Sequence, residues 1–212
     1  MSAWDERAEA YRTSEAHREG EDLDLLVEWA AGAKTALDVG TGGGHVARRL
    51  REAGLEVVSS DPAAGMRADV VAPAEHLPFA DGSFDVVASR IAAHHFEDVE
   101  GATREMARVA RERVLVVDIL LADEASDEAE RLRDPSHVRY YTQDEWRAFF
   151  AAAGLDIEEE RILPRDVGFA DYLERTGCGG EEADRVRALL GDHVEGDTFH
   201  LTAVALNGRK EA

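Results

Sequence analysis

A glycine-rich turn between a short apolar run and a helical pattern most constrains how this chain can fold. The run TALDV (35–39) precedes the segment GTGGGH (40–45), and an amphipathic helical pattern then continues to Gly54. Glycine permits positive φ angles and lets a ligand approach the main chain closely. Because strand, helix and the following run LEVVSS form a βαβ unit, we expect this turn at the ligand-binding edge of an open parallel sheet. A glycine-rich turn that binds no ligand is the alternative.

Apolar runs beyond this unit continue the alternation of strands and helices. Four further strands of the sheet are expected at 55–60, 69–71, 84–89 and 113–120, several of them apolar on both faces. Towards the C-terminus, a strand near 155–163, a helical insertion at 169–191 and a strand at 198–206 indicate an antiparallel hairpin. The pattern predicts an α/β, Rossmann-like, doubly wound, seven-stranded and mostly parallel sheet. Its last strand is expected to be antiparallel, with a helical arm at the N-terminus and the helical insertion before that strand.

Charge and composition exclude several classes of partner. The 212 residues include 24 Lys and Arg against 45 Asp and Glu, a net charge of -21, so we expect no nucleic-acid partner. No apolar run approaches the roughly 18 residues that span a bilayer, and the polar opening MSAWDERAEAYR predicts a cytoplasmic protein without a secretory signal. The single cysteine, Cys178, lies among glycines, and no Cys/His cluster has the spacing of a metal site.

The second strand ends at a carboxylate whose spacing suits a nucleoside. Asp61 follows Gly40 by 21 residues, about where an acidic side chain accepts hydrogen bonds from the ribose hydroxyls of an adenosine. The alternative is an ordinary turn residue before Pro62. A dinucleotide-binding turn would have its third glycine at position 45, which is His45, so the glycines instead fit GxGxG.

A longer motif narrows the fold to a family. The segment AEHLPFADGSFDVVASRIAAHHF (74–96), together with the GxGxG turn after Asp38, resembles class I S-adenosylmethionine-dependent methyltransferases of the UbiE-like, methyltransferase type 11 family. The resemblance covers 5–207 and is most specific over 36–96. It implies one domain over 1–212, with an N-terminal arm or lid (1–32), a cofactor-binding half (33–122) and an acceptor-side half (123–212).

The resemblance also implies which residues bind the cofactor, S-adenosylmethionine. Its methionine part is expected above the glycine turn and its adenine near the residues that precede LPF. Pro73 replaces the family's usual aspartate, so adenine recognition is expected to depend on Glu75 or on the backbone. Only 12 residues separate Asp61 from Ala74, too few for the helix that most relatives have there, and Met66 is either an adenine contact or a core residue. The expected cofactor contacts in this half are Asp38, Gly40, Thr41, Gly42, Asp61, Pro62, Met66, Ala74, Glu75 and Arg90.

Two adjacent histidines are the candidates for a role beside the transferring methyl group. Arg90, His94 and His95 follow a strand at the carboxyl end of the sheet, where open α/β folds bind ligands. A histidine with a pKa near 6.5 can accept a proton from an acceptor as it is methylated. The alternative is that at least one of the two rings only hydrogen-bonds the backbone.

Two further segments resemble a subgroup of the same family. In that subgroup an N-terminal arm closes over the cofactor, which implies Tyr11 and His17 as contacts; a solvent-exposed helix is the alternative. The segment DPSHVRYY (134–141) is implied to line the acceptor pocket. Its candidates are His137, Arg139, Tyr140 and Tyr141, although Arg139 could instead pair with surface carboxylates.

The sequence therefore predicts in-line transfer of a methyl group from S-adenosylmethionine to a small-molecule acceptor, with S-adenosylhomocysteine as the product. Methyl transfer depends mainly on alignment of the reacting atoms. Two alternatives remain: a non-catalytic S-adenosylmethionine-binding protein and, less in keeping with His45 and the LPF segment, an NAD-dependent oxidoreductase. The acceptor, the atom methylated and the oligomeric state are not specified by the sequence.

Overall fold

A seven-strand sheet runs through the structure, a computed structural model that describes residues 18–210. Tyr11 and His17 lie outside the described residues. The strand order is β3-β2-β1-β4-β5-β8-β6, and a two-residue β7 also pairs with β8. The strands are β1 (Thr35–Val39), β2 (Glu56–Asp61), β3 (Val70–Val71), β4 (Phe84–Arg90), β5 (Ala110–Ile119), β6 (Leu155–Gly168), β7 (Val194–Glu195) and β8 (Thr198–Lys210).

The directions of the strands confirm the predicted fold class. Neighbouring strands from β3 to β5 pair in parallel, whereas β8 is antiparallel to both β5 and β6. The last strand inserts between β5 and β6, so the C-terminal hairpin contributes an interior strand as well as the edge. This topology is the Rossmann-like doubly wound sheet expected from the alternation of strands and helices.

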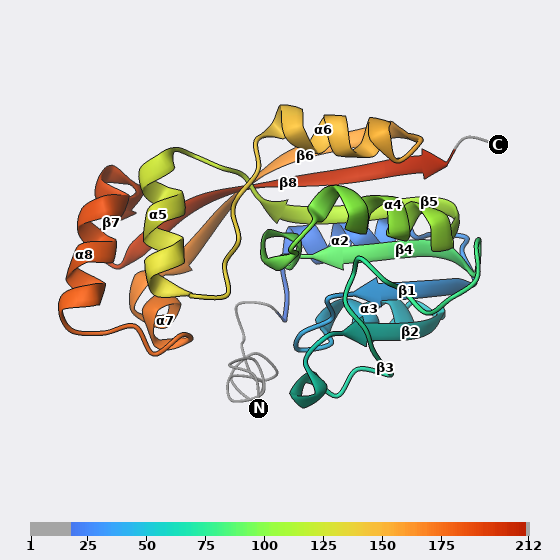
Figure 1. Cartoon of the computed structure of the whole chain (residues 1–212), viewed down its shortest axis with the longest axis horizontal. Helices are drawn as coiled ribbons and strands as arrows, with labels where there is room; N and C mark the ends of the chain where they lie inside the picture. The colour runs from blue at the N-terminus through green and yellow to red at the C-terminus, as the bar shows by residue number, and fades with distance from the viewer. Residues whose placement is uncertain (1–17, 211–212) are drawn as a thin grey trace.

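Helices cover both faces of the sheet (Figure 1). One face carries α2 (Glu21–Trp29) and α3 (His45–Glu52), whose apolar side chains pack with the strands in one buried cluster. The other face carries α4 (Val99–Val109) and α6 (Gln143–Ala152), where Trp146 and Phe150 are fully buried. The α6 helix begins with a capping box, in which the side chains of Thr142 and Glu145 each accept from the other's backbone amide.

A second, smaller body is built on the far end of the β6–β8 ribbon, which pairs from Leu155↔Lys210 to Gly168↔Thr198. This ribbon extends beyond the sheet, and its outer end carries α5 (Glu124–Arg133), α7 (Phe169–Glu174), α8 (Glu181–Leu190) and β7 (Figure 1). We call α5, α7, α8, β7 and the outer ends of β6 and β8 the cap lobe. It has its own apolar cluster: Ala129, Val167, Phe169, Tyr172, Val186, Leu190 and Phe199.

The cap lobe corrects the expected element boundaries. Both ribbon strands are longer than predicted, reaching Gly168 and Lys210, because main-chain pairing between two strands needs no continuous apolar alternation. The helical insertion at 169–191 is present as α7 and α8, but the acidic stretch after Asp123 is also a helix, α5. Asp123 caps α5 by accepting a hydrogen bond from the Ser126 amide, and the Ser126 hydroxyl oxygen accepts one from the Asp123 amide.

The connection from β2 to β4 is too short to contain a full crossover helix. One 3-10 turn, η2 (Ala64–Met66), and the two-residue β3 replace a full crossover helix there. None of the helices within 18–210 is long and apolar enough to cross a membrane.

Candidate functional site

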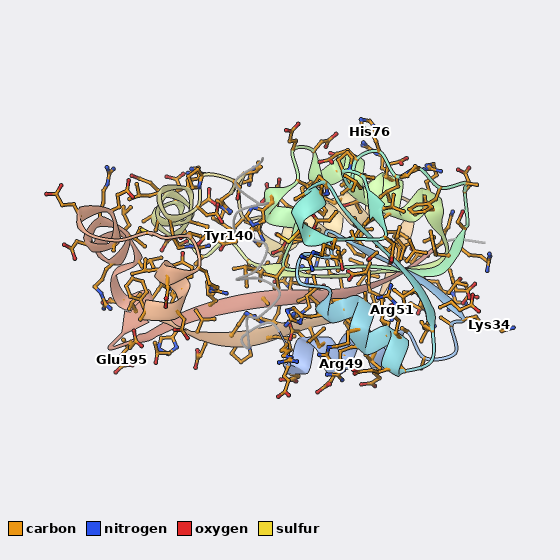
Figure 2. The ribbon with its side chains drawn as sticks, turned by 90° about the horizontal axis from the view of Figure 1, so that it is seen from below. Lys34, Arg49, Arg51, His76, Tyr140 and Glu195 are labelled. Carbon is orange, nitrogen blue, oxygen red and sulfur yellow. The ribbon has the colours of Figure 1, made fainter. Side chains whose placement is uncertain are left out.

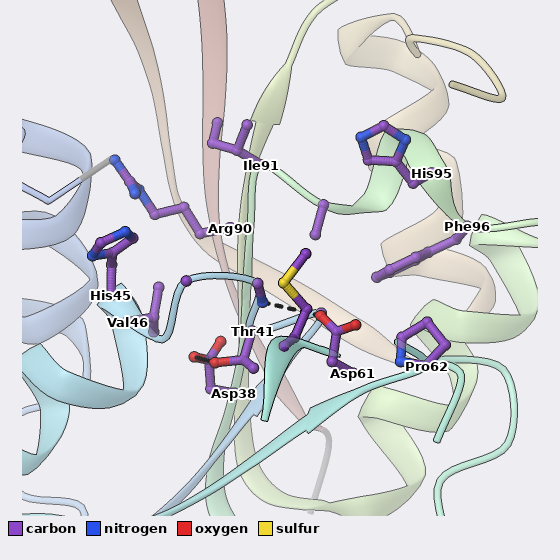
Figure 3. Close-up of a pocket in the computed structure, with 15 residues that line it drawn as sticks. Asp38, Thr41, His45, Val46, Asp61, Pro62, Arg90, Ile91, His95 and Phe96 are labelled. Carbon is purple, nitrogen blue, oxygen red and sulfur yellow. Dashed lines mark hydrogen bonds between the residues drawn. The ribbon is translucent and has the colours of Figure 1, made fainter. Parts of the chain in front are cut away.

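The principal cavity lies where β1, β2 and β4 end, and it holds about 850 Å³ including its open mouth. The glycine turn and the residues just after β4 form its opposite walls (Figure 3). Its lining residues are Asp38, Gly40, Thr41, Gly42, Gly43, His45, Val46, Asp61, Pro62, Met66, Arg90, Ile91, Ala92, His95 and Phe96. We call it the cofactor cavity, because it gathers most of the residues that the sequence predicted to bind one.

The glycine turn exposes main chain to this cavity in a conformation that favours glycine. Gly40 and Gly42 have φ angles of 65° and 49°. A Cβ atom on Gly40 would lie 2.8 Å from the Ala92 Cβ, so this position is also sterically closed to side chains. A Cβ on Gly42 would meet nothing within 4 Å, so the backbone there borders open space that a ligand can occupy.

Two carboxylates support the turn from the strand ends below it. Asp38 accepts hydrogen bonds from the Thr41 hydroxyl at 2.5 Å and the Ala47 amide at 3.0 Å. Asp61 accepts from the Gly42 amide at 3.0 Å and the Ala63 amide at 2.9 Å. Burial raises the pKa of Asp38 to about 6 despite its hydrogen bonds, and it also raises the pKa of Asp61. Asp38 therefore shapes the turn, and Asp61 presents an acceptor at the cavity wall.

Arg90 occupies the end of β4 and joins it to α2. Its Nε and Nη2 atoms donate to the two carboxylate oxygens of Asp22 at 2.6 and 3.0 Å, and both side chains are buried. Arg165 of the cap lobe ribbon also donates to Asp22, at 3.3 Å. This shared carboxylate fixes the N-terminal helix beside the cavity.

Ile91, the next residue, has a φ angle of 51°, a left-handed conformation that is costly for a β-branched side chain. Its amide donates to the Val117 carbonyl at 2.7 Å, which holds the chain in this path at the end of the sheet. Backbone strain of this kind is common at functional sites. The strained residue lines the cofactor cavity and also a second one.

The second cavity, which we call the inner cavity, lies between the sheet and the cap lobe and holds about 510 Å³ including its open mouth. Tyr140, one of its wall residues, is labelled in Figure 2 at the junction of these two bodies. The inner cavity shares Ile91 and His95 with the cofactor cavity. Its remaining walls are His94, Ile119, Glu130, Arg133, Tyr140, Arg165, Val167, Tyr172, Arg175 and Leu201.

His94 forms a buried pair with Asp118 at the end of β5. The His94 Nδ1 atom lies 2.6 Å from an Asp118 carboxylate oxygen, and the other oxygen accepts from the His94 amide at 2.9 Å. Burial opposes a charge on this ring, but the Asp118 carboxylate outweighs that effect and raises the pKa of His94. The Asp118 carboxylate therefore holds the ring in a fixed orientation and favours its protonated form.

His95 has the opposite character although its ring centroid lies 4.2 Å from that of His94. Burial, followed by repulsion from His94, lowers the pKa of His95 to about 3. Its Nδ1 lies 3.0 Å from the Ser136 carbonyl oxygen, so the neutral ring carries its proton on Nδ1 and its lone pair on Nε2. The expected backbone hydrogen bond is thus present at His95, on a ring that also lines both cavities.

The remaining predicted residues divide between the cavities and the core. Ala74 is buried in the core, and Glu75 accepts from the Asp98 amide at 3.2 Å; neither is among the residues lining the cofactor cavity. Met66 does line it.

Of the candidates in 134–141, only Tyr140 lines the inner cavity. His137 donates from Nε2 to an Asp127 carboxylate oxygen at 2.8 Å and does not line the inner cavity. Arg139 pairs with Glu145 and lies over the Tyr141 ring, as the surface-pair alternative anticipated.

Sequence reasoning missed Asp118 and the arginines of the cap lobe. Asp118 lies in the expected strand VLVVD, and a carboxylate at the end of a buried strand was the available signal. Nothing local marks Arg133, Arg165 and Arg175, because only the folded ribbon brings them together. Within 18–210 no group of three or more His, Cys, Asp or Glu side chains could hold a metal ion.

Comparisons with known proteins agree with this architecture. Residues 37–117 match a family model described as a methyltransferase domain. The chain is 33% identical over 227 residues to the uncharacterized methyltransferase YcgJ of Bacillus subtilis (strain 168), covering 94% of this chain and 88% of that protein. The crystal structure of YcgJ superposes with a TM-score of 0.78 and 29% identity, covering 90% and 98% of the two chains.

A second relative has a named reaction. The chain is 30% identical over 205 residues to the malonyl-[acyl-carrier protein] O-methyltransferase of Geobacter sulfurreducens, covering 81% of this chain and 76% of that protein. The family model, the near full-length relative and the shared fold agree with the motif at 74–96. The chain belongs to the methyltransferase type 11 family of class I, S-adenosylmethionine-dependent methyltransferases.

Proposed function

We propose that this methyltransferase binds S-adenosylmethionine in the cofactor cavity and methylates a small molecule held in the inner cavity, by in-line displacement that leaves S-adenosylhomocysteine. The observation that carries the proposal is the wall common to the two cavities, formed by Ile91 and His95. Because Ile91 and His95 line both cavities, a methyl donor in one and an acceptor in the other would lie next to each other at these two residues.

The residues of the cofactor cavity fit the methyl donor. Open main chain at Gly42 suits close approach of the methionine part, and Asp38, Gly40 and Thr41 keep the turn in shape. The buried Asp61 carboxylate, with Pro62 beside it, would accept hydrogen bonds from the ribose hydroxyls. Met66, and by family resemblance Ala74 and Glu75, would face the adenine; Arg90 would border the methionine end, with Tyr11 and His17 covering it.

The chain's own residues contribute to the reaction by orienting the acceptor and by forming hydrogen bonds to it. S-adenosylmethionine, when bound, supplies a methyl group already activated by its sulfonium. Holding an acceptor in line with that group can contribute roughly 7–11 kcal/mol through proximity. His95, neutral with its lone pair on Nε2, would accept a hydrogen bond from a hydroxyl or amine acceptor and so orient it, because burial and His94 make this ring too weak a base to keep a proton. His94, fixed by Asp118, would orient the acceptor and stabilise negative charge beside it.

Size and position favour a small acceptor. The inner cavity lies between the sheet and the cap lobe and holds about 510 Å³ including its open mouth, so only a small molecule would fit there. Tyr140 would contact that molecule directly. His137, Arg139 and Tyr141 would support this wall, through the Asp127 hydrogen bonds to His137 and to the Tyr140 amide and through the packing of Arg139 on Tyr141.

Replacing the ribose carboxylate tests the cofactor site. Asp61→Ala should weaken S-adenosylmethionine binding by about 1–3 kcal/mol, because a charge-assisted contact is lost. Isothermal titration of the wild type and the variant measures this difference. Asp144→Ala, at an exposed carboxylate on α6, is the control and should bind as the wild type does. An Asp61→Ala variant with wild-type affinity would remove Asp61 from the site.

A further inference from the structure

We infer that the methyl acceptor carries a carboxylate, which the arginines on the cap-lobe side of the inner cavity hold away from the atom that is methylated. This inference rests on the proposed function, because it takes the inner cavity as the acceptor site. It adds the chemical class of the acceptor. Charge, anchoring and the relative positions of the lining residues support it.

The inner cavity is cationic in a protein that is strongly anionic. Its walls include three guanidinium groups, from Arg133, Arg165 and Arg175, against one carboxylate, Glu130. The protein as a whole has a net charge of -21. An anion that enters this cavity therefore meets a local excess of positive charge in a protein whose net charge is negative. An excess of arginine at one enclosed place favours a ligand with the opposite charge.

Two of the three arginines, Arg133 and Arg165, are held in position by contacts within the protein. Arg133 pairs with the buried Glu130, donates to the Tyr172 carbonyl at 3.0 Å and lies with its guanidinium carbon 4.0 Å from the Tyr172 ring centroid. Arg165 donates to Asp22, a carboxylate that Arg90 already holds through both oxygens. These contacts fix the guanidinium planes, so a ligand would not have to order them.

Nearby carboxylates do not fully neutralise the positive charge around the inner cavity. Burial and then repulsion from Arg90 lower the pKa of Arg165, with Arg175 adding to the repulsion in spite of Asp22. A guanidinium has five N–H donors, so it can keep a protein partner on one edge and bind a carboxylate with another. A bound carboxylate would relieve this repulsion, and planar pairing with arginine is the geometry that carboxylates favour.

The positions of the lining residues would place the carboxylate of the acceptor away from the atom that is methylated. His95 and Ile91 line both cavities, whereas Arg133, Arg165 and Arg175 line only the inner one. Apolar side chains make up other parts of the wall, namely Ile119, Val167, Leu201 and the rings of Tyr140 and Tyr172. The acceptor is thus an acid with an apolar or aromatic body, whose carboxylate is a recognition group and remains unmethylated.

Matched neutral and charged probes test this inference. The full-length protein is titrated with benzoate, benzamide and phenyl phosphate, with and without saturating S-adenosylhomocysteine. We expect benzoate to bind at least tenfold more tightly than benzamide. Arg175→Gln should weaken benzoate binding at least tenfold, and Arg175→Lys, which keeps the charge, should restore part of it. Arg185→Gln removes the same charge from an exposed side chain of the cap lobe and should change nothing.

Each other outcome has a defined meaning. Equal affinity for benzoate and benzamide, or wild-type benzoate affinity in Arg175→Gln, would overturn the inference. Tighter binding of phenyl phosphate than of benzoate would overturn the choice of a carboxylate. Failure of the wild type to bind S-adenosylhomocysteine would count against the proposed function, while benzoate selectivity measured without it would still decide the present inference.

Discussion

The two cavities differ in how the chain constructs them. The cofactor cavity takes most of its wall from one βαβ unit, in which the glycine turn after β1 faces the end of β2. The inner cavity takes its wall from β5, α5, β6, α7 and β8, which are distant in sequence and meet only through the β6–β8 ribbon. The proposed donor site therefore depends on local backbone geometry, and the proposed acceptor site depends on tertiary packing. If both assignments hold, substitutions in the cap lobe would change acceptor specificity and leave the donor site unchanged.

The two cavities also differ in the charged side chains that line them. The cofactor cavity has buried carboxylates, Asp38 and Asp61, whose hydrogen bonds maintain a turn. The inner cavity has arginines and a histidine pair on its walls. A donor with ribose hydroxyls suits the first arrangement, and an acidic acceptor suits the second.

The largest expected effect comes from emptying the separate core of the cap lobe. Leu190→Ala truncates a side chain that is 1% exposed and should destabilise the protein by about 2–5 kcal/mol. Leu37→Ala, in the core beneath the glycine turn, should cost a similar amount. Urea unfolding measures both. Under native conditions Leu190→Ala should keep its affinity for S-adenosylhomocysteine and Leu37→Ala should lose part of it; equal loss in both would contradict the independence of the two sites.

A matched pair of glycines tests the geometry of the turn. Gly40→Ala should destabilise the protein by about 2–4 kcal/mol, because the left-handed φ and the clash with the Ala92 Cβ act together. Gly44→Ala should cost only about 1–2 kcal/mol, since its φ is 77° but its Cβ would meet nothing within 4 Å. Chemical denaturation of both variants checks the order. Equal stability would mean that the close approach at Gly40 is absent.

Acid should act oppositely at the two sites. The folded-state pKa of His95 lies below the usual 6.5, so below that pH the unfolded chain takes up a proton that the folded protein excludes, and stability falls. The pKa of Asp38 is raised to about 6, so between about pH 6 and pH 4 the folded protein binds the extra proton and stability rises.

Each of these contributions is on the order of 1–2 kcal/mol at pH 5. Urea unfolding of His95→Asn and Asp38→Asn at pH 5 and pH 7 separates them. Relative to the wild type, acid should stabilise His95→Asn and destabilise Asp38→Asn. The same pH dependence in all three proteins would argue against both assignments.

The smallest effect concerns the strained wall that the two cavities share. Ile91→Gly should be about 1 kcal/mol more stable than Ile91→Ala, because alanine keeps the penalty of a positive φ and glycine does not. Glycine is ordinarily the more destabilising of the two residues. Differential unfolding of the pair measures the strain directly, and a more stable alanine variant would show that Ile91 is unstrained.

The sequence predicted the cofactor half well because its signals are local. The GxGxG turn and the carboxylate at Asp61 each lie within a short window, and the structure has the expected elements at both. The succession of strands and helices along the chain followed from the alternation of apolar runs. Family resemblance supplied the identity of the cofactor, which spacing alone left open between two classes of nucleoside.

The acceptor half was less predictable because its contacts are non-local. The α5 helix was missed since Asp123 and Ser126 form a capping box without the usual Glu or Gln, within a run that is mostly charged. The Asp118 partner of His94 lies 24 residues away on another strand, and the arginines gather only when the ribbon extends beyond the sheet. The pattern of apolar and polar residues could indicate helices and strands here, but it could not indicate which side chains come into contact.

The most direct test of the central claim is the thermal midpoint of the purified protein with S-adenosylmethionine, S-adenosylhomocysteine or NAD. At about a hundred times the Kd a ligand adds roughly 2.7 kcal/mol, which raises the midpoint of a chain of this size by about 5–10 °C. We predict that shift with the first two ligands and none with NAD. No shift with S-adenosylmethionine or S-adenosylhomocysteine, or an equal shift with NAD, would contradict the assignment of the cofactor cavity.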